Sequence, residues 1–299
     1  MKGKTVVITG ANSGIGKETA KALAIEGAEI VMACRDLDRA QAARAEIVAA
    51  SANEAVRVMQ LDLASLASVK AFTDNFNKEF DHLDVLINNA GLFPMKKHMS
   101  QDGFELQFAV NHLGHFLLTQ LLLPQLQSSK KARIINVASM LHNLGKIDFH
   151  SFRGEKKYNP LMAYAQSKLA NVLFTRELAK RFQDTNISAY SLHPGAVGTN
   201  IAGRSFWRRT VYKLMGGVLT PNRGARTSVY LAHTPDIERF SGGYFDEFCR
   251  LKSGSKRSQD SQVAAQLWSV SDELVKPFLE SGVNDKTSLK TQLSPEAEY

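Results

Sequence analysis

Six short apolar runs recur along the chain, separated by segments of helical composition. The runs cover residues 5–9, 29–33, 56–61, 85–88, 134–138 and 187–192, and the clearest helical segments cover residues 17–26, 37–50 and 66–80. Strands that alternate with helices indicate βαβ units, and nearly continuous Val, Ile and Leu content is typical of strands buried on both faces. The pattern therefore predicts an α/β fold in which helices cover both faces of a parallel sheet.

The chain has 299 residues, with no linker rich in Pro, Gly or Ser before residue 280 and no internal repeat. This length suits one large α/β domain. We therefore predict a single domain over residues 1–280 and a flexible, polar C-terminal tail over residues 281–299.

Composition narrows the class of protein. Hydrophobic residues make up 44% of the chain and charged residues 22%, as in ordinary soluble globular proteins. The two cysteines, Cys34 and Cys249, do not provide a disulfide framework and suit a reducing compartment. Since we see no signal-peptide core and no long uninterrupted apolar stretch, we expect a cytoplasmic protein. The net charge of +8 is not arranged as a basic and aromatic groove, so it favours an anionic cofactor over nucleic acid.

A glycine-rich segment, Thr9-Gly10-Ala11-Asn12-Ser13-Gly14-Ile15-Gly16, follows the first apolar run. Between a strand and a helix, glycines let the backbone approach a pyrophosphate, and the N–H groups at the helix N-terminus can bind it. A plain strand–helix turn is the alternative, but the position after the first strand of an alternating chain favours a dinucleotide site. The predicted contacts are Gly10, Asn12, Ser13, Gly14, Ile15 and Gly16.

The second apolar run ends at Cys34-Arg35-Asp36. In a dinucleotide fold this end of the strand faces the adenosine ribose, where a carboxylate favours NAD and an arginine accommodates the 2′-phosphate of NADP. Arg35 can form charge-assisted hydrogen bonds with that phosphate, and Arg39 lies one helical turn later. We therefore predict that Arg35 binds NADP (NADPH), while Asp36 keeps NAD open as the alternative.

Tyr164 and Lys168 stand four residues apart, shortly after Asn159-Pro160, which is typical of a helix N-terminus. Four residues are about one helical turn, so both side chains project from one face. The lysine charge favours the phenolate form of the tyrosine, so the pair suits general acid or base chemistry. Because this spacing is common in helices, it gains weight only from the motifs that precede it.

Three further segments complete a recognisable set: Asp62-Leu63 after the third run, Asn88-Asn89-Ala90-Gly91 at the end of the fourth, and Ser139 after the fifth. With the glycine-rich segment and the Tyr/Lys pair, they resemble the short-chain dehydrogenase/reductase family over about residues 4–280. The resemblance implies an oxidoreductase with a single-domain, Rossmann-type, doubly wound sheet of about seven strands, which also carries the active site. It also implies that Asp62 binds the adenine amino group.

The resemblance implies a catalytic tetrad of Asn111, Ser139, Tyr164 and Lys168. Tyr164 would donate a proton to the carbonyl oxygen as hydride arrives, or remove it in the reverse direction. Lys168 would tune Tyr164 and bind the nicotinamide ribose, while Ser139 would bind the substrate oxygen, where donors stabilise developing charge. Asn111 lies in the segment 104–123, whose mostly apolar composition predicts one helix. It would hold a water that links Lys168 to solvent, or make a structural hydrogen bond to backbone, or do both.

The same resemblance extends the cofactor site to the segment after the sixth run, which would contact the nicotinamide. The further cofactor-binding residues implied are Leu63, Asn89, Ala90, Gly91, Tyr164, Lys168, Pro194, Gly195, Val197 and Thr199. His193 stays outside this mechanism as a packing residue. His112 and His115 lack the carboxylate or Cys neighbours that a metal site requires, so we predict no metal.

Segments 32–36, 111–116 and 267–268 are most similar to the retinol dehydrogenases. This branch implies NADP-dependent interconversion of a carbonyl and an alcohol, on retinal, retinol or other apolar aldehydes. Two alternatives stay open: an enzyme similar to light-dependent protochlorophyllide reductases, and a non-catalytic, NADP-binding regulatory protein. The complete tetrad favours an enzyme.

Residues 202–218 include the cluster Phe206-Trp207-Arg208-Arg209. The resemblance implies a mobile lid here over an apolar substrate, and the basic residues suit peripheral contact with an anionic membrane surface. An ordinary amphipathic helix is the alternative. Many family members form dimers or tetramers through the helix that carries the tyrosine and its neighbour, although others are monomers, so a homo-oligomer is a further expectation.

Overall fold

In the computed structural model of the chain, residues 1–196 and 219–280 are described, and eight strands within them form one sheet. The strands are β1 (Thr5–Thr9), β2 (Glu29–Cys34), β3 (Val56–Gln60), β4 (Val85–Asn88), β5 (Ala132–Val137), β6 (Ile187–Leu192), β7 (Tyr244–Phe245) and β8 (Leu251–Lys252). Their spatial order is β3-β2-β1-β4-β5-β6-β7-β8. β1 to β7 are parallel, and β8 pairs antiparallel with β7.

This order confirms the predicted doubly wound, Rossmann-type parallel sheet. The expected number of about seven strands is one too low, because the two-residue strand β8 adds to the edge at β7. The strand order reverses between β1 and β4, and ligands of such sheets bind where the carboxyl ends of the strands meet this reversal.

Helices connect the strands and begin at recognisable caps. The helical elements are α1 (Gly14–Ile25), α2 (Leu37–Ser51), α3 (Leu66–Glu79), α4 (Leu106–Phe108), the π-helical turn η1 (Ala109–Leu113), α5 (Gly114–Leu121), α6 (Leu123–Ser128), the 3-10 turn η2 (Met140–Leu144), α7 (Pro160–Arg181), α9 (Pro221–His233), the 3-10 turns η4 (Glu238–Phe240) and η5 (Arg257–Gln259), and α10 (Ser261–Glu280). Side-chain oxygens of Asp36, Ser65 and Asn159 accept backbone N–H groups at the starts of α2, α3 and α7. The predicted helix start at Asn159-Pro160 is confirmed.

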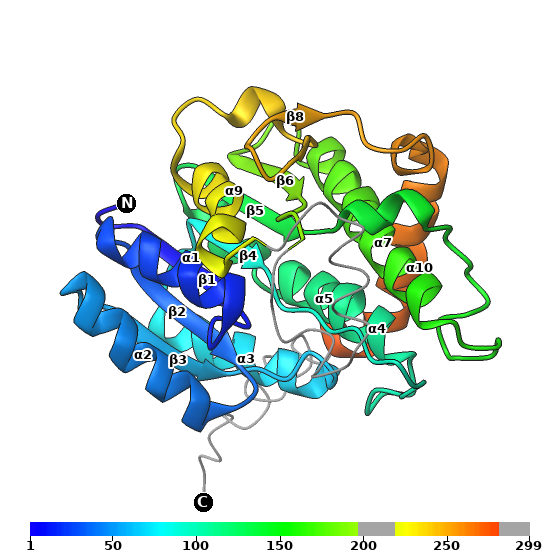
Figure 1. Cartoon of the computed structure of the whole chain (residues 1–299), viewed down its shortest axis with the longest axis horizontal. Helices are drawn as coiled ribbons and strands as arrows, with labels where there is room; N and C mark the ends of the chain where they lie inside the picture. The colour runs from blue at the N-terminus through cyan, green and yellow to red at the C-terminus, as the bar shows by residue number, and fades with distance from the viewer. Residues whose placement is uncertain (197–218, 281–299) are drawn as a thin grey trace, which may run out of the picture.

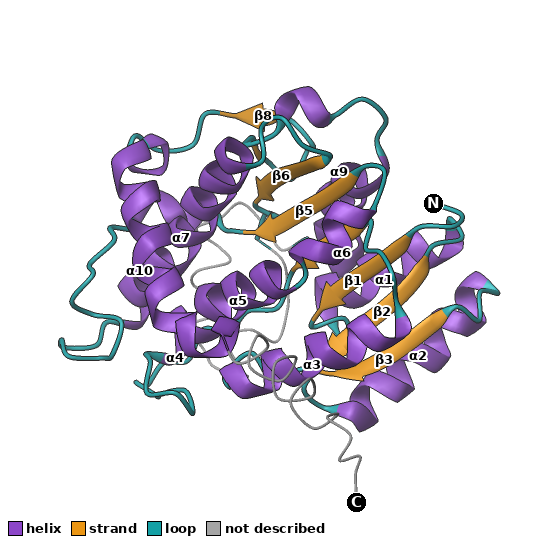
Figure 2. Ribbon diagram, turned by 180° about the vertical axis from the view of Figure 1, so that it is seen from behind, coloured by secondary structure: helices purple, strands orange, loops and turns teal. Residues whose placement is uncertain are grey.

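The sheet separates two hydrophobic cores. Val6 and Ile8 of β1 pack in the core that includes α1, α2 and α9, whereas Val7 between them packs in the core that includes α3, α5, α7 and α10. Figures 1 and 2 view these two layers from opposite sides. Alternate side chains of a strand point to opposite faces, so a parallel strand covered on both sides is apolar at every position.

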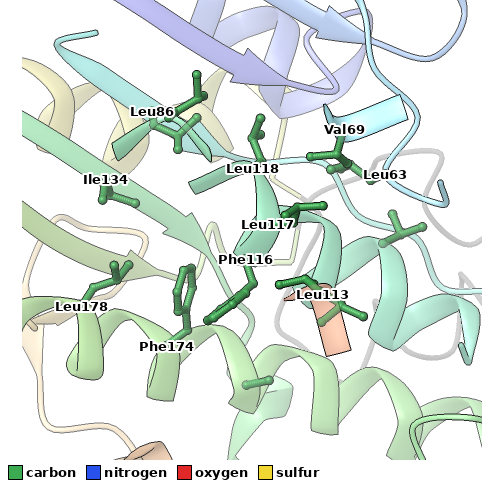
Figure 3. Packing of buried hydrophobic residues seen from close by; sticks show 14 of the residues in the cluster. Leu63, Val69, Leu86, Leu113, Phe116, Leu117, Leu118, Ile134, Phe174 and Leu178 are labelled. Carbon is green, nitrogen blue, oxygen red and sulfur yellow. The ribbon is translucent and has the colours of Figure 1, made fainter. Parts of the chain in front are cut away.

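The core on the side of α3, α5, α7 and α10 joins these helices through aromatic contacts. Phe116 of α5 and Phe174 of α7 face each other in this layer (Figure 3), with ring centroids 5.2 Å apart. Trp268 of α10 contacts both rings, at 5.1 and 5.8 Å, and Arg181 lies 4.3 Å from the centroid of the Trp268 ring. Burying one such aromatic side chain stabilises the fold by roughly 2–3 kcal/mol. Helix α10 therefore holds α5 and α7 together (Figure 2).

One helix differs from the sequence prediction. The apolar segment 104–123 was expected to form a single helix, but it divides into α4, the π-turn η1, α5 and the start of α6. The π-turn contains Asn111, so the helix is locally widened at a predicted catalytic residue. Single π-turns inside helices occur frequently at functional sites.

Candidate active site

A cavity of about 370 Å³ opens at the reversal between β1 and β4. Most of the predicted cofactor residues line it: Gly10, Asn12, Ser13, Gly14, Ile15, Gly16, Arg35, Asp62, Leu63, Asn89, Ala90, Gly91, Tyr164, Lys168 and Pro194. Gly195 directly follows Pro194, whereas Val197, Thr199 and the segment 202–218 lie outside the described residues. Residues that follow six of the strands thus line one cavity.

The glycine-rich loop forms the floor of the cavity. Gly10 and Gly14 adopt left-handed backbone angles, with φ of 67° and 57°, which favour glycine. A Cβ on Gly16 would lie 2.5 Å from both Asn89 Nδ2 and Gly10 O, so this position admits only glycine without rearrangement. The first N–H groups of α1 begin at this loop, and such a helix N-terminus favours a phosphate. The loop therefore fits the pyrophosphate of a dinucleotide.

Charged residues line the cavity where β2 and β3 end. Arg35 and Arg39 line it together with Asp36, and both arginines are exposed to solvent. The Asp36 carboxylate caps α2 by accepting the N–H of Arg39 at 3.0 Å. Asp62 accepts the N–H of Ala64 at 2.9 Å, which holds the turn after β3. The cavity thus offers the two guanidinium groups of Arg35 and Arg39. The Asp36 carboxylate beside them already accepts a backbone N–H group.

Thr9 connects the glycine-rich loop to the end of β4. Its hydroxyl accepts the N–H groups of Asn89 and Ala90, both at 2.9 Å, and its carbonyl accepts Asn89 Nδ2 at 2.8 Å. These bonds fix the Asn88–Gly91 segment against β1. A Cβ on Gly91 would lie 3.3 Å from both Asn111 Oδ1 and Lys168 Nζ, so the absence of a side chain allows the chain to pass close to them.

Asn111 is fully buried, and its side chain is used within the protein. Its Oδ1 accepts the N–H of Leu92 at 2.8 Å, and its Nδ2 donates to Leu92 O at 3.1 Å and to Ser167 Oγ at 2.9 Å. Ser167 Oγ in turn donates to Tyr164 O at 2.8 Å. The structural hydrogen bond to backbone that the sequence suggested is therefore present.

Lys168 extends from α7 into the interior. It is 3% exposed, and its Nζ donates to Val137 O at 2.9 Å. Burial lowers the pKa of its ammonium group to about 8. Its Nζ lies 5.6 Å from the centroid of the Tyr164 ring, so the predicted pair shares one face of the helix. A buried ammonium with a lowered pKa can release and take up protons near neutral pH.

Tyr164 is half-buried and lies against Phe93. The two rings meet edge to face with centroids 5.1 Å apart. Sequence reasoning missed Phe93, and also Leu92 and Val110, which line the cavity. The only signal in the sequence was that these residues stand close to Gly91 or Asn111. Such closeness along the chain does not show whether a side chain points into the cavity. Leu92 and Val110 therefore add apolar surface to the cavity that Tyr164 lines, and Phe93 packs against the Tyr164 ring.

Ser139 stands where β5 leaves the sheet, next to the cavity-lining residues Val137 and Ala138. Its Oγ accepts the N–H of Leu141 at 3.2 Å, which leaves the hydroxyl hydrogen available to donate. His142 is fully buried, and its Nδ1 donates to Ser139 O at 2.8 Å. Because a carbonyl oxygen only accepts hydrogen bonds, this contact places a proton on His142 Nδ1. The hydrogen bond also holds the backbone of Ser139 against the His142 ring.

Cys34 and His193 lie in surroundings that suit a structural role. Burial raises the pKa of the Cys34 thiol to about 11, which leaves this thiol unreactive. His193 Nε2 lies 3.2 Å from Glu247 Oε2. In residues 1–196 and 219–280 we find no group of three or more His, Cys, Asp or Glu side chains placed to bind a metal ion. Within the same ranges, no helix combines the length and apolar character needed to span a membrane.

Comparisons with known proteins agree with this geometry. A sequence model described as short chain dehydrogenase matches residues 4–209. Retinol dehydrogenase 11 of Homo sapiens is 45% identical over 276 residues, covering 92% of this chain and 86% of the relative. Retinol dehydrogenase 12 of Bos taurus is 47% identical over 274 residues, with 91% and 86% covered. The chain therefore belongs to the short-chain dehydrogenase/reductase family. Within that family it falls in the retinol dehydrogenase branch, as an oxidoreductase that acts on a CH–OH group.

Solved structures show the same fold. An uncharacterized protein from Mycobacterium paratuberculosis has a TM-score of 0.75 at 36% identity, covering 92% of this chain and 94% of that chain. A short chain dehydrogenase from Shigella flexneri, solved with NADP, has a TM-score of 0.66 at 22% identity, covering 83% and 98%. The second likeness concerns the fold alone.

Proposed function

We propose that this protein is an NADP-dependent oxidoreductase that interconverts a retinal-like or other apolar aldehyde and its alcohol. The observation that carries the proposal is that Tyr164 and Lys168 line the same cavity as the glycine-rich loop. A proton donor is thereby held in the cavity that fits the dinucleotide. When bound, NADPH supplies the hydride for carbonyl reduction and NADP accepts it in the reverse reaction.

The roles of the protein's own groups follow from their positions. Ser139 donates its hydroxyl hydrogen to the substrate oxygen, and Tyr164 transfers a proton to or from that oxygen. Lys168 holds a positive charge beside Tyr164, which favours the phenolate that remains after proton donation. Asn111 keeps the chain at Leu92 and Ser167 in place, so that these groups stay aligned.

Two features support NADP over NAD. Arg35 and Arg39 both line the end of the cavity where β2 finishes, and both are exposed and free to turn toward a phosphate dianion. Asp36, the carboxylate that would favour NAD, caps α2 instead. We therefore infer that the arginines bind the 2′-phosphate.

An apolar substrate is supported by the wall of the cavity and by the names of the relatives. Phe93 packs against Tyr164, and Leu92 and Val110 line the cavity. The relatives are named retinol dehydrogenases. Membrane contact through residues 206–209 and the lid over residues 202–218 stay predictions, because these residues lie outside the described ranges. A homo-oligomer also stays a prediction, and α10 already covers part of the α5 and α7 surface.

The proposal is tested with a panel of aldehydes and ketones, including all-trans-retinal, assayed with NADPH and with NADH. We expect reduction of apolar aldehydes and a preference for NADPH. Tyr164→Phe should abolish turnover and leave NADPH binding nearly unchanged, while Tyr230→Phe, at a half-buried tyrosine on α9 outside the cavity, should retain full activity. Undiminished turnover by Tyr164→Phe would contradict the proposed proton transfer.

A further inference from the structure

A buried histidine lies one turn after Asn111 and links two parts of the site. His115, at the start of α5, is 2% exposed. Its Nε2 lies 2.8 Å from Thr9 Oγ1, and its Nδ1 lies 3.2 Å from Asn111 O. Thr9 ends β1 beside the glycine-rich loop, and Asn111 belongs to the π-turn. One imidazole ring therefore bridges the cofactor loop and the tetrad asparagine.

The partners fix where the imidazole proton resides. A backbone carbonyl only accepts hydrogen bonds, so the contact with Asn111 O requires a proton on His115 Nδ1. Burial lowers the pKa of His115 to about 3, and the nearby Lys168 charge acts in the same direction, so the ring is neutral. Nε2 is therefore the acceptor, and the Thr9 hydroxyl donates to it.

This assignment also completes the bonds of Thr9. The Thr9 oxygen accepts two N–H groups, from Asn89 and Ala90, at 2.9 Å each. Its one hydrogen then goes to His115 at 2.8 Å rather than to Ile87 O at 3.5 Å. The hydroxyl thus has one donated and two accepted bonds, which is its full capacity. An unbroken chain of hydrogen bonds runs from the end of β4 through Thr9 and His115 to Asn111.

The chain of bonds ends beside Lys168. Asn111 Oδ1 and Lys168 Nζ lie at the same distance, 3.3 Å, from the place that a Cβ on Gly91 would take. A π-turn is rarer than an α-helical turn, so we infer that side-chain contacts stabilise this one. The N–H of His115 supplies such a contact to the Asn111 carbonyl from the side of the cofactor loop.

We propose that His115 is a positioning residue that holds the Asn111 turn in register with Lys168 and with the glycine-rich loop. It touches neither reactant and acts through Asn111 and Thr9. Loss of its N–H bond to Asn111 lets the turn relax toward regular α-helix, which displaces Asn111 from Lys168. The effect on catalysis rests on the proposed function, whereas the effect on Lys168 can be measured without turnover.

Two polar substitutions separate the two bonds of the ring. His115→Asn carries its amide nitrogen near the place of Nδ1 and can still donate to Asn111 O. His115→Gln reaches the place of Nε2, so it can contact Thr9 but not Asn111 O. We expect kcat to fall by about tenfold more in His115→Gln than in His115→Asn, since misplacement by about 1 Å can cost up to roughly a hundredfold. The dissociation constant for NADPH should change less than about threefold in both variants, which is a smaller effect than the roughly tenfold difference in kcat.

A matched control is the hydrogen bond that joins His112 of the π-turn to α10. His112 is also fully buried, and its Nε2 lies 3.1 Å from Ser271 Oγ of α10, away from the cofactor loop. Ser271→Ala removes a buried hydrogen bond of similar length and should lower the melting temperature without changing kcat. Equal kcat values for His115→Asn and His115→Gln at equal stability would overturn the proposal and leave His115 a structural residue.

A second measurement follows Lys168 itself. The titration midpoint of Lys168, observed by NMR in the apoprotein, should shift in His115→Gln and stay at the wild-type value in Ser271→Ala. The ¹⁵N chemical shifts of the His115 ring in the wild type should show a protonated Nδ1 and an unprotonated Nε2. If the wild type reduces no carbonyl compound, the proposed function fails while this measurement still decides the role of His115. An unchanged Lys168 midpoint in His115→Gln, or a proton on Nε2, would overturn it.

Discussion

Replacing Lys168 with methionine should make the apoprotein more stable while it removes activity. Lys168 is 3% exposed, and burial lowers the pKa of its ammonium group from 10.5 to about 8. At 1.36 kcal/mol per pKa unit, folding with this buried charge costs about 3 kcal/mol at neutral pH. Methionine has a similar length and no charge, and Val137 O keeps its bond from Asn171 Nδ2 at 3.2 Å. We therefore expect the free energy of unfolding to rise by about 2–3 kcal/mol.

The gain should depend on pH in a defined direction. The pKa of Lys168 in the folded state lies below its unfolded value of 10.5, so the unfolded state binds the proton more tightly. The cost is complete below pH 8 and is lost as the pH rises toward 10.5. The advantage of Lys168→Met should therefore fall from about 3 kcal/mol at pH 7 to about 1 kcal/mol at pH 10.

Urea unfolding of the apoprotein at pH 7 and pH 10 measures this difference. The apoprotein is used because a bound cofactor would add its own stabilisation. Lys180→Met, an exposed position near the end of the same helix, is the control and should change stability by less than about 0.5 kcal/mol. If Lys168→Met is no more stable than the wild type at pH 7, or gains equally at both pH values, the reasoning about the buried charge is wrong.

Three further outcomes can be measured directly. Arg35→Ala should weaken NADPH about tenfold more than NADH, because hydrogen bonds to a charged group contribute roughly 1.5–3 kcal/mol; equal losses in fluorescence titrations would show that Arg35 does not contact the 2′-phosphate. Gly16→Ala places a Cβ 2.5 Å from Asn89 Nδ2, so NADPH affinity should drop at least about tenfold by the same titration, and an unchanged affinity would contradict the close packing of the loop. Burial lowers the pKa of His112 to about 4 and that of His115 to about 3, so stability is complete above pH 6.5 and lost as the pH falls. Between pH 7.5 and pH 5, each of these histidines should lower the free energy of unfolding by about 2 kcal/mol, as measured by urea unfolding. Over the same pH range, the free energy of unfolding of His112→Gln should fall by about 2 kcal/mol less than that of the wild type.

The local patterns of the chain predicted most of the fold. Alternation of apolar runs with helical segments predicted the parallel sheet, and Asn159-Pro160 predicted the start of α7. These signals are readable because strand burial, helix capping and glycine backbone angles depend on neighbouring residues. The strand count was low by one because β8 is a two-residue strand with exposed side chains, which leaves no apolar run to detect.

Contacts across the sheet were not readable in the same way. Asn111 bonds Ser167, 56 residues away, and Thr9 meets His115, 106 residues away. The apolar pattern around Asn111 predicted a regular helix, because a π-turn adds one residue to a turn without changing which residues are apolar. Thr9 meets His115 because the strand order places β1 beside β4, and Asn111 meets Ser167 because α7 packs against the π-turn.

The sequence by itself determined the kind of sheet, the glycine-rich loop after β1 and the Tyr164/Lys168 pair, because each depends on spacing along a few residues. The tertiary structure decided how deeply Lys168 is buried, that Phe93 packs on Tyr164, and that a neutral His115 bridges Thr9 and Asn111. Burial and proton placement depend on every element packed around a group, and the order of residues along the chain does not specify that packing before the sheet has formed.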